Sequence, residues 1–184
     1  MSSSLLYGLG IMSGTSLDGL DICYVEFKEN DDNYFKIINS KTFKYNSSWV
    51  NKLSNIHLKN DLEIKKIDLE YGLLISQKIL EFKKDNNISN LDFISSHGHT
   101  VKHKPPDYSI QIGNGKVIRE VTNVTTINDF RSQDIKLGGQ GAPLVPIGDK
   151  YLFGKYDSCL NLGGIANISF DYIGNIKAFD ICGC

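Results

Sequence analysis

The chain has 184 residues, of which 41% are hydrophobic and 22% are charged, and its 20 Lys and Arg against 21 Asp and Glu give a formal net charge of −1. This composition is typical of a globular protein of about one domain, and it excludes disordered, collagen-like and small disulfide-dependent classes. The balanced charge, without a long basic run, argues against nucleic acid as a partner.

The chain opens with an apolar stretch, residues 5–12, which predicts a β-strand. This stretch is too short to span a bilayer, and no Lys or Arg precedes it, so we expect a soluble cytoplasmic protein without a membrane partner. Because the four cysteines form no CxxC pattern, we expect reduced thiols. Two further strands are predicted at residues 21–27 and 34–45, and the turn-forming residues 13–19 make the opening a β-turn-β-β unit.

A long amphipathic helix is predicted after this unit. Its apolar side chains recur at spacings of three, four, seven and eight residues, with Asp61 as the N-cap and a stop at Asn86. A shorter helix is predicted before it at residues 47–57, and a short strand after it at residues 91–96. A crossover of strand, helix and strand pairs its strands in parallel, which indicates an α/β sheet.

The remaining predicted elements are short. They are strands at residues 108–112 and 124–127, helices at 116–121 and 144–153, and strands at 158–162, 168–172 and 176–181. A glycine-rich bend at residues 138–143 precedes the second of these helices. The predicted fold is therefore α/β with a mixed sheet opening β-turn-β-β-α, and a second run of hairpin strands begins near its end.

Two turns are candidate phosphate-binding loops. Residues 14–19 combine two hydroxyls, a carboxylate and two glycines, which suits backbone N–H donors around a phosphate, with Asp18 on Mg²⁺ directly or through water. The Walker pattern is absent from them. After a later strand, Gly163 and Gly164 let a ligand approach the backbone. Each turn alone is more often a plain hairpin turn, but two on one sheet, one at each end, favour a polyphosphate held from two sides.

Asp180 and a histidine pair are candidate catalytic or ligand-binding residues. Asp180 stands at the predicted carboxyl end of a strand, where α/β sheets place catalytic groups and where an Asp also commonly caps a turn. His97 and His99 follow a strand as an HxH pair. A metal site there needs further ligands that the chain hardly offers, so polar contacts to a ligand are the favoured interpretation.

Opposite charges follow the predicted strand at residues 124–127. Asp129 and Arg131 lie on one face if that strand continues, with Gln140 close by in the sequence. They form either a simple ion pair or a fork of donors and acceptors suited to the hydroxyls of a sugar or to a carboxylate.

Five segments in a fixed order cover essentially the whole chain. They are IMSGTSLDGLD at residues 11–21, SHGHTVKHKP at 96–105, QIGN at 111–114, NDFR at 128–131 with GGQGAPLVP at 138–146, and NLGGIAN at 161–167 through FD at 179–180. In this order they resemble the anhydro-N-acetylmuramic acid kinase family of the actin-like ATPase and sugar kinase superfamily.

The resemblance implies a fold and a nucleotide site. The fold is an actin-like ATPase (ribonuclease H-like) α/β domain, whose mixed sheet carries helices on both faces, and the cofactors are ATP and Mg²⁺. Asp18 is the implied metal contact. The implied ATP-binding residues are Gly14, Thr15, Ser16, Leu17, Asp18, Gly19, Leu20, Asp21, Gly163 and Gly164.

The resemblance also implies a reaction. The family cleaves the 1,6-anhydro ring of anhydro-N-acetylmuramic acid and phosphorylates the same sugar, giving N-acetylmuramic acid 6-phosphate in cell-wall recycling. Asp180 resembles the base that takes a proton from water as the water attacks the anomeric carbon. The residues expected to contact the sugar are His97, Asp129, Arg131 and Gln140.

Two departures from the family bear on these expectations. The family usually has Gln where this chain has His99, and its chain continues past Asp180 into a second, adenosine-binding domain, whereas this sequence ends at Cys184. We therefore expect residues 1–184 to be the amino-terminal domain of such a kinase, inactive without the missing carboxyl-terminal domain. The alternatives are a stand-alone sugar- or phosphate-binding module and a metallohydrolase that uses the HxH pair. The oligomeric state stays open, with a homodimer among the candidates.

Overall fold

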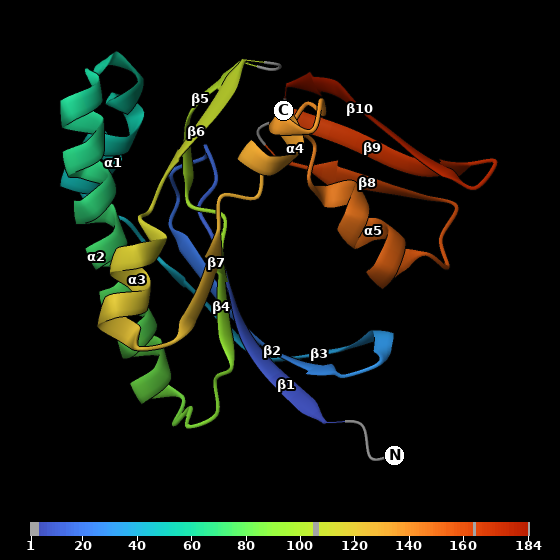
Figure 1. Ribbon diagram of the computed structural model, residues 1–184, viewed down its shortest axis with the longest axis horizontal. Helices are drawn as coiled ribbons and strands as arrows, with labels where there is room; N and C mark the ends of the chain where they lie inside the picture. The colour runs from blue at the N-terminus through green and yellow to red at the C-terminus, as the bar shows by residue number, and fades with distance from the viewer. Residues whose placement is uncertain (1–3, 105–106, 164, 184) are drawn as a thin grey trace.

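Two sheets and a hairpin organise the chain (Figure 1). The computed structural model describes residues 4–104, 107–163 and 165–183. The larger sheet contains, in spatial order, β3 (Asp31–Phe43), β2 (Leu20–Lys28), β1 (Leu5–Met12), β4 (Phe93–Ser96) and β7 (Thr125–Asn128). The smaller sheet contains β10 (Asn175–Gly183), β9 (Ile165–Tyr172) and β8 (Ser158–Leu162), and the hairpin pairs β5 (His99–Lys104) with β6 (Tyr108–Ile112). The expectation that both glycine turns lie on one sheet is therefore wrong.

The first three strands run antiparallel, which confirms the predicted β-turn-β-β opening. β1 pairs with β2 without a shift, whereas the pairing of β2 with β3 has two register shifts. Alternate residues of β2 are buried from Leu20 to Tyr24, because successive side chains of a strand point to opposite faces of the sheet. The third strand begins at Asp31, earlier than the predicted residue 34.

The predicted crossover is also confirmed. Helices α1 (Ser47–Ser54) and α2 (Asp61–Asp85), joined by the 3-10 helix η1 (Ile56–Leu58), precede β4, and α3 (Gly115–Thr122) precedes β7. β4 pairs in parallel with β1, and β7 pairs in parallel with β4. Parallel strands end at the same edge of a sheet, so the loops that follow β1, β4 and β7 meet there.

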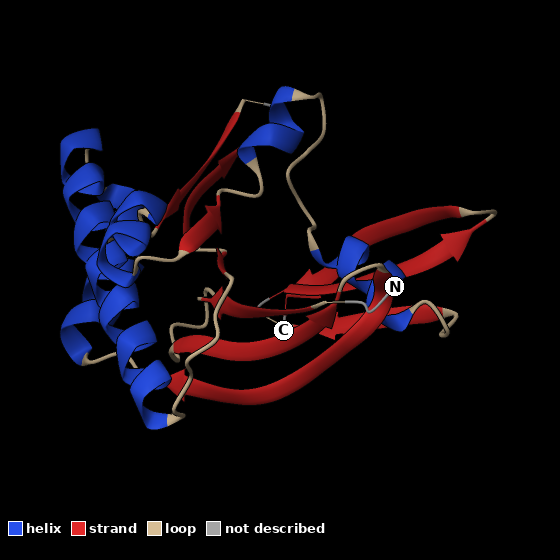
Figure 2. Cartoon of the chain, turned by 60° about the horizontal axis from the view of Figure 1, so that its bottom comes forward, coloured by secondary structure: helices blue, strands red, loops and turns tan. Residues whose placement is uncertain are grey.

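The core lies between the larger sheet and helices α2 and α3. On α2 the side chains of Tyr71, Ile75, Ile79 and Phe82 are fully buried and form one cluster with strand residues such as Ile94. Burying each such side chain contributes about 1.5–3 kcal/mol. Figure 2 shows these helices gathered against one side of the strands. Helix α5 (Val145–Phe153) contacts β3 from the other side, so helices flank the mixed sheet on both faces (Figure 1).

Helix α2 begins with a capping box at Asn60. The Asn60 side chain accepts a hydrogen bond from the Glu63 N–H at 3.0 Å, and the Glu63 carboxylate accepts one from the Asn60 N–H at 3.1 Å. Asp61 is the first helical residue, so the prediction that Asp61 is the N-cap is wrong. Asn and Asp are both common N-cap residues. Glu63 lies three residues after Asn60, the spacing that a capping box requires, so Asn60 is the cap.

Two elements have no counterpart in the sequence predictions, β5 and α4 (Ser132–Lys136). The His and Lys residues of β5 leave no alternation of apolar and polar residues in its sequence, so no strand was predicted there. Its pairing with β6 stabilises it as a strand. Gly98, just before β5, has φ +68°, and a Cβ there would collide with the Ile112 carbonyl oxygen, so only glycine allows this entry into the hairpin. Helix α4 has five residues and none is buried, so it leaves no apolar period in the sequence.

The smaller sheet repeats the arrangement of the first three strands. β8, β9 and β10 are consecutive and antiparallel, and a glycine-containing connection joins the first two, as it joins β1 and β2. The predicted strands here are confirmed, with β9 beginning at Ile165 and β10 reaching Gly183. The second run of hairpin strands is therefore a separate sheet.

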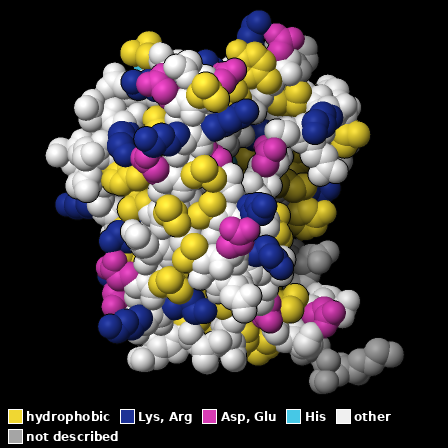
Figure 3. Space-filling view, turned by 60° about the vertical axis from the view of Figure 1, so that its left-hand side comes forward, with side chains coloured by type: hydrophobic (Ala, Val, Ile, Leu, Met, Phe, Trp, Pro, Cys, Tyr) yellow, Lys and Arg dark blue, Asp and Glu magenta, His cyan; other side chains and the backbone are white. Residues whose placement is uncertain are grey.

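The surface over the helices is mixed in charge. Figure 3 shows Lys and Arg interspersed with Asp and Glu on this face, without a large area of one sign. This pattern agrees with the formal net charge of −1. None of the described helices is long and apolar enough to cross a membrane.

The capping box of α2 predicts unequal effects for two neighbouring substitutions. Asn60→Ala should lower the free energy of unfolding by about 1 kcal/mol, because it removes the N-cap acceptor. Asp61→Ala is the matched control. It removes only the favourable interaction of the Asp61 charge with the helix dipole, so the free energy of unfolding should fall by about 0.3 kcal/mol. Urea unfolding of both variants measures the difference, and a larger effect for Asp61→Ala would contradict the assignment of the cap.

Candidate active site

A cavity of about 1340 Å³ brings together four of the residues predicted to act on a ligand. His97 lies at the end of β4, Arg131 and Gln140 lie in the segment between β7 and α5, and Asp180 lies on β10. The wall also includes Asn161 of the second glycine segment, together with apolar residues of α5. The cavity therefore joins the end of the larger sheet to the smaller sheet.

Arg131 is held in this cavity by two acceptors. Its guanidinium donates to His97 Nε2 at 2.9 Å and to the Gly141 carbonyl oxygen at 2.5 Å. The other ring nitrogen of His97, Nδ1, donates to the Gly98 carbonyl oxygen at 2.9 Å. This arrangement requires a neutral imidazole, and burial lowers the pKa of His97, which the adjacent Arg131 charge lowers further. His97 therefore positions the arginine.

Asp129 does not join Arg131. Its carboxylate accepts hydrogen bonds from the Ser132 hydroxyl at 2.7 Å and the Ser132 N–H at 3.3 Å, and its own φ is +56°. The ion pair that the sequence left open is absent from the described salt bridges. Asp129 is a turn residue before α4 and lines a smaller, neighbouring cavity of about 420 Å³ instead of the large one. The fork of donors toward a ligand thus belongs to Arg131, whose Nε is buried and has no partner among the described residues.

Asp180 lies within a strand, and not at its end as predicted. It stands opposite Asn167 of β9, and a β-bulge follows it between Asp180 and Cys182. Bulges re-aim side chains and occur next to active sites. The side chain is exposed at the cavity wall, which leaves the carboxylate accessible to water and ligand.

The loop between β1 and β2 is the first of the two predicted phosphate-binding loops. The side chains of Thr15, Ser16 and Asp18 are exposed, and Ser16 donates a hydrogen bond to Asp18 at 2.7 Å, which lowers the pKa of that carboxyl group. Leu17 has φ +58°, and a Cβ on Gly19 would approach the Phe43 carbonyl oxygen to 2.8 Å. The backbone of the loop is thus tightly constrained while its polar groups face outward.

Other residues predicted to bind ATP have structural contacts. The Leu20 side chain is 1% exposed and belongs to the core, and Asp21 accepts a hydrogen bond from Thr42 of β3. Gly163 is exposed in the connection of β8 to β9, next to Gly164, which lies outside the described residues together with Pro105.

A buried chain of polar groups lies beneath the β1–β2 loop, and the sequence predictions did not include it. Ser13, 2% exposed, accepts a hydrogen bond from the Tyr45 hydroxyl at 2.9 Å and lies 3.1 Å from His99 Nδ1. The Tyr45 hydroxyl also lies 2.6 Å from that of Tyr71. Each hydroxyl has one proton, so the chain runs from Tyr71 to Tyr45 to Ser13 to His99. Tyrosine hydroxyls at otherwise apolar core positions are the only sequence signal for it.

His99 is the final acceptor of this chain. Its ring is 4% exposed, and burial, with a smaller contribution from His97, lowers its pKa to about 4. A neutral His99 can accept the Ser13 proton, whereas an imidazolium has no acceptor nitrogen and would leave the Ser13 proton without this partner. The departure from the family pattern at this position therefore places a neutral acceptor under the loop.

The histidine pair does not form a metal site. Both His97 nitrogens are engaged, and His99 Nδ1 faces Ser13. Across residues 4–104, 107–163 and 165–183, no three His, Cys, Asp or Glu side chains gather in a way that could hold a metal ion. A single carboxylate such as that of Asp18 is compatible with Mg²⁺, because this ion keeps several waters and is usually bound by one or two carboxylates plus substrate phosphates.

The fold and the site define the class of protein. A mixed sheet that opens with three antiparallel strands, a polar loop after β1, a helical crossover and a second three-strand unit with its own glycine connection are those of an actin-like ATPase fold. The family model of anhydro-N-acetylmuramic acid kinase matches residues 6–182. The chain belongs to this family.

Curated relatives agree with this assignment. The chain is similar to the anhydro-N-acetylmuramic acid kinase of Photobacterium profundum, with 37% identity over 172 residues, which is 88% of this chain and 45% of the relative. The kinase of Vibrio vulnificus is 36% identical over 180 residues, 92% of this chain and 48% of the relative. That of Sulfurimonas denitrificans is 32% identical over 171 residues, 88% of this chain and 46% of the relative. The chain spans about half the length of the curated relatives it matches.

Burial of neutral His99 predicts that stability depends on pH. The folded state keeps His99 neutral to about pH 4, whereas the unfolded chain takes up a proton near pH 6.5, as histidine ordinarily does. The unfolded state thus binds more protons between these values, so the free energy of unfolding falls as the pH drops through this range. The loss from His99 should be about 2–3 kcal/mol between pH 7 and pH 4.5.

The substitution His99→Gln removes this titration but keeps an acceptor for Ser13. Urea unfolding at both pH values should show a clearly smaller loss in the variant. An equal loss in the two proteins would show that His99 is charged in the fold.

Proposed function

We propose that this chain provides the phosphate-binding loop and much of the sugar site of an ATP-dependent kinase that opens 1,6-anhydro-N-acetylmuramic acid and phosphorylates it to N-acetylmuramic acid 6-phosphate. The observation that carries the proposal is the convergence of Asp180, Arg131, His97 and Gln140 on one cavity of about 1340 Å³, in a chain of this kinase family. A cavity of this size holds a modified monosaccharide, since ligand sites commonly measure about 300–1,000 Å³ and this one is open toward solvent.

Asp180 acts as a general base in this proposal. Its carboxylate takes a proton from a water molecule while the water oxygen forms a bond to the anomeric carbon of the sugar. The bond between that carbon and O6 breaks, O6 leaves with the electron pair, and the proton that Asp180 took from water is passed to O6, which becomes a hydroxyl. General-base assistance of this kind contributes typically 10²–10⁴-fold to the rate. The exposed position of Asp180 at the cavity wall suits this role.

Arg131 orients the sugar. Two of its donor groups are taken by His97 and Gly141, which fixes the plane of the guanidinium, and its buried Nε has no protein partner in the described chain. A fixed planar donor suits a hydroxyl or carboxylate oxygen of the sugar. Gln140 adds an amide at the same wall.

The β1–β2 loop binds the nucleotide. MgATP supplies the phosphoryl group that the freed O6 receives, and such transfers depend mainly on positioning and charge neutralisation. The exposed hydroxyls of Thr15 and Ser16 and the carboxylate of Asp18 fit this ligand, with Asp18 holding Mg²⁺. Gly163 lies on the second sheet, where it would approach the polyphosphate from the other side.

The smaller sheet begins a second domain in this proposal, which revises the expectation that residues 1–184 form a single domain. Its apolar side chains are largely exposed. More than half of the side-chain surface is accessible at Leu160, Leu162, Ile165, Phe179 and Ile181. The part of the family's length that this chain does not span would pack there and complete the nucleotide site, so the 184 residues alone would be inactive. A cytoplasmic location follows from the use of ATP, and a homodimer remains a prediction.

The base assignment is tested by Asp180→Asn in a chain extended to the length of its relatives. Turnover of 1,6-anhydro-N-acetylmuramic acid with ATP should fall about 10²–10⁴-fold, because the amide cannot take a proton. Asp171→Asn is the matched control, since Asp171 only accepts a hydrogen bond from Gly174 N–H in the β9–β10 turn and the amide oxygen preserves that bond. Undiminished turnover by Asp180→Asn would refute the role, and binding without turnover in the unsubstituted protein would favour a binding module.

The metal assignment is tested by Asp18→Asn. Affinity for ATP in the presence of Mg²⁺ should fall at least about tenfold in a calorimetric titration, because a charged ligand of the metal is lost. Asp31→Asn, at the opposite end of β2 from the loop, should bind as the unsubstituted protein does. Equal affinities for Asp18→Asn and the control would contradict the assignment.

A further inference from the structure

The buried chain of polar groups, which runs from Tyr71 through Tyr45 and Ser13 to His99, meets the β1–β2 loop at Ser13. Strand β1 ends one residue earlier, and the Ser13 side chain is 2% exposed. Thr15, two residues further on, is exposed to solvent. Ser13 therefore joins the exposed part of the loop to the interior of the protein.

The two ends of this loop are held differently. At its exit, the Leu20 side chain is buried in the core, and a Cβ on Gly19 would approach the Phe43 carbonyl oxygen to 2.8 Å. At its entry, Ser13 is followed by Gly14, and glycine restricts the backbone less than any other residue. The direction in which the backbone enters the loop therefore depends on the side-chain contacts of Ser13.

The Ser13 hydroxyl is held from two sides. It accepts a hydrogen bond from the Tyr45 hydroxyl at 2.9 Å and donates its own proton to His99 Nδ1 at 3.1 Å. The Tyr45 hydroxyl is held in turn by that of Tyr71, which lies 2.6 Å away. These partners come from the segment after β3, from the start of β5 and from α2. Ser13 cannot turn to another rotamer without losing both bonds.

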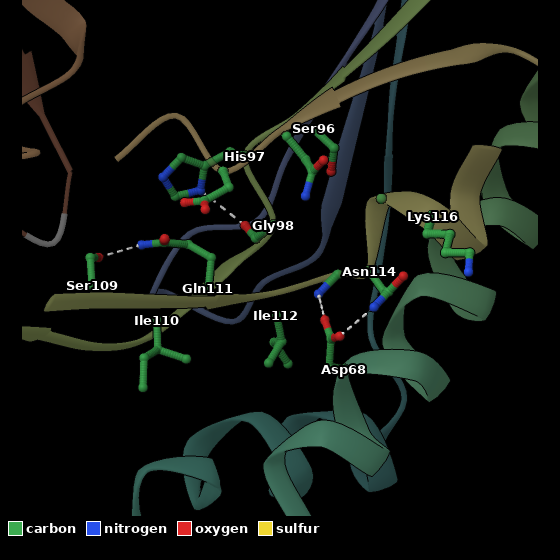
Figure 4. Close-up of a pocket in the computed structure, with 14 residues that line it drawn as sticks. Asp68, Ser96, His97, Gly98, Ser109, Ile110, Gln111, Ile112, Asn114 and Lys116 are labelled. Atoms are coloured by element: carbon green, nitrogen blue, oxygen red, sulfur yellow. Dashed lines mark hydrogen bonds between the residues drawn. The ribbon is translucent and has the colours of Figure 1, made fainter. Parts of the chain in front are cut away.

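Helix α2 fixes both ends of the hydrogen-bonded chain. Tyr71, at one end, is fully buried in the core. One turn earlier on the helix, the Asp68 carboxylate accepts a hydrogen bond from the Asn114 side chain at 2.7 Å (Figure 4). This contact holds the turn after Ile112, the residue that pairs with His99 in the β5–β6 hairpin. The same helix thus sets the position of the first donor and of the last acceptor.

The hydroxyl groups of the two tyrosines add little to the packing of the core. The ring of Tyr71 lies with its centroid 5.4 Å from that of Trp49, 6.4 Å from that of Tyr45 and 6.5 Å from that of His99. Phenylalanine in place of either tyrosine would keep these ring contacts. Replacing hydrogen-bonded groups by apolar groups of the same shape is often nearly neutral for stability. What the hydroxyls add is one fixed conformation of Ser13.

We infer that Tyr45, Tyr71 and His99 are positioning residues for the nucleotide. Acting through Ser13, they hold the entry of the β1–β2 loop in the conformation that receives the phosphates. This inference rests on the proposed function, which places ATP at this loop. A loop that is already held in its binding conformation loses less conformational freedom when the ligand binds. The three residues therefore raise the affinity for ATP without touching it.

Tyr45→Phe tests the inference on the chain itself, because it removes the donor to Ser13 and the acceptor of Tyr71 together. In the 184-residue chain without nucleotide, the ¹⁵N order parameters of Gly14 and Thr15 should fall from about 0.85, the value of rigid backbone, towards about 0.6. Unchanged order parameters would overturn the inference.

ATP binding is measured by calorimetry, in the presence of Mg²⁺, with the chain extended to the length of its relatives. Tyr45→Phe should weaken it about 3–10-fold. Tyr24→Phe is the matched control: the Tyr24 hydroxyl donates to the Asn90 carbonyl oxygen at 2.8 Å, and Asn90 precedes β4, at the edge of the sheet opposite the loop. Both variants should unfold at lower urea concentration, but only Tyr45→Phe should bind ATP more weakly. Equal affinities in the two variants would contradict the inference.

A double-mutant cycle tests whether the effect passes through Ser13. Ser13→Ala should weaken ATP binding by itself, and adding Tyr45→Phe to it should weaken binding by less than about twofold more, because the residue through which the tyrosine acts is gone. A full further 3–10-fold loss, of the size expected for one hydrogen bond, would show that Tyr45 acts by another route. His99→Leu should weaken binding as Tyr45→Phe does, and His99→Gln, which keeps an acceptor, should lose clearly less.

The two kinds of measurement separate this inference from the proposed function. If the extended protein binds no ATP, the proposed function fails, and the order parameters alone decide whether the hydrogen-bonded chain positions the loop. If ATP binds and is turned over normally while Tyr45→Phe changes neither the order parameters nor the affinity, the inference fails and the proposed function stands.

Discussion

Parallel pairing of β1, β4 and β7 is the constraint on which the site depends. The register aligns Ile11 with Ser96 and Ser96 with Asn128, so all three strands end at one level. The loop after β1, the histidine pair after β4 and the Asp129 turn after β7 therefore share one edge of the sheet. The helices that the crossovers require cover the face behind them and supply the buried core, so the same topology stabilises the fold and gathers the polar loops.

Hydrogen bonds then give each loop a fixed conformation. The hydrogen-bonded chain from Tyr71 through Tyr45 and Ser13 to His99 joins the start of the β1–β2 loop to α2 and to the β5–β6 hairpin. Arg131 is held by His97 in the same way, from a strand end to a segment some thirty residues away. Both arrangements need neutral histidines, and burial supplies that condition. A flexible polar edge thus becomes a preorganised one, which is what binding and positioning of a phosphorylated or sugar ligand require.

Local sequence patterns were sufficient for most strands and the long helix, because alternation and amphipathic spacing are local signals. The set of cavity residues was expected from the resemblance to the kinase family. The local patterns did not identify the N-cap of α2, for which Asn60 and Asp61 are both suitable residue types. The Glu63 side chain, which bonds back to Asn60, decides between them. Partners distant in the sequence were also out of reach: the Asp129 turn bond, the tyrosine chain and the collision that demands glycine at Gly98 depend on tertiary contacts. The short helix α4 buries nothing and so leaves no pattern.

In the proposed function one sugar lies in the large cavity, between Arg131 in the loops of the first sheet and Asp180 of the second sheet. A crystal structure of the extended protein with 1,6-anhydro-N-acetylmuramic acid tests it most directly. The account predicts the sugar in this cavity, with its anomeric carbon facing Asp180 across one water molecule and Arg131 donating to a ring substituent. A sugar bound elsewhere, or an anomeric carbon turned away from Asp180, would contradict it.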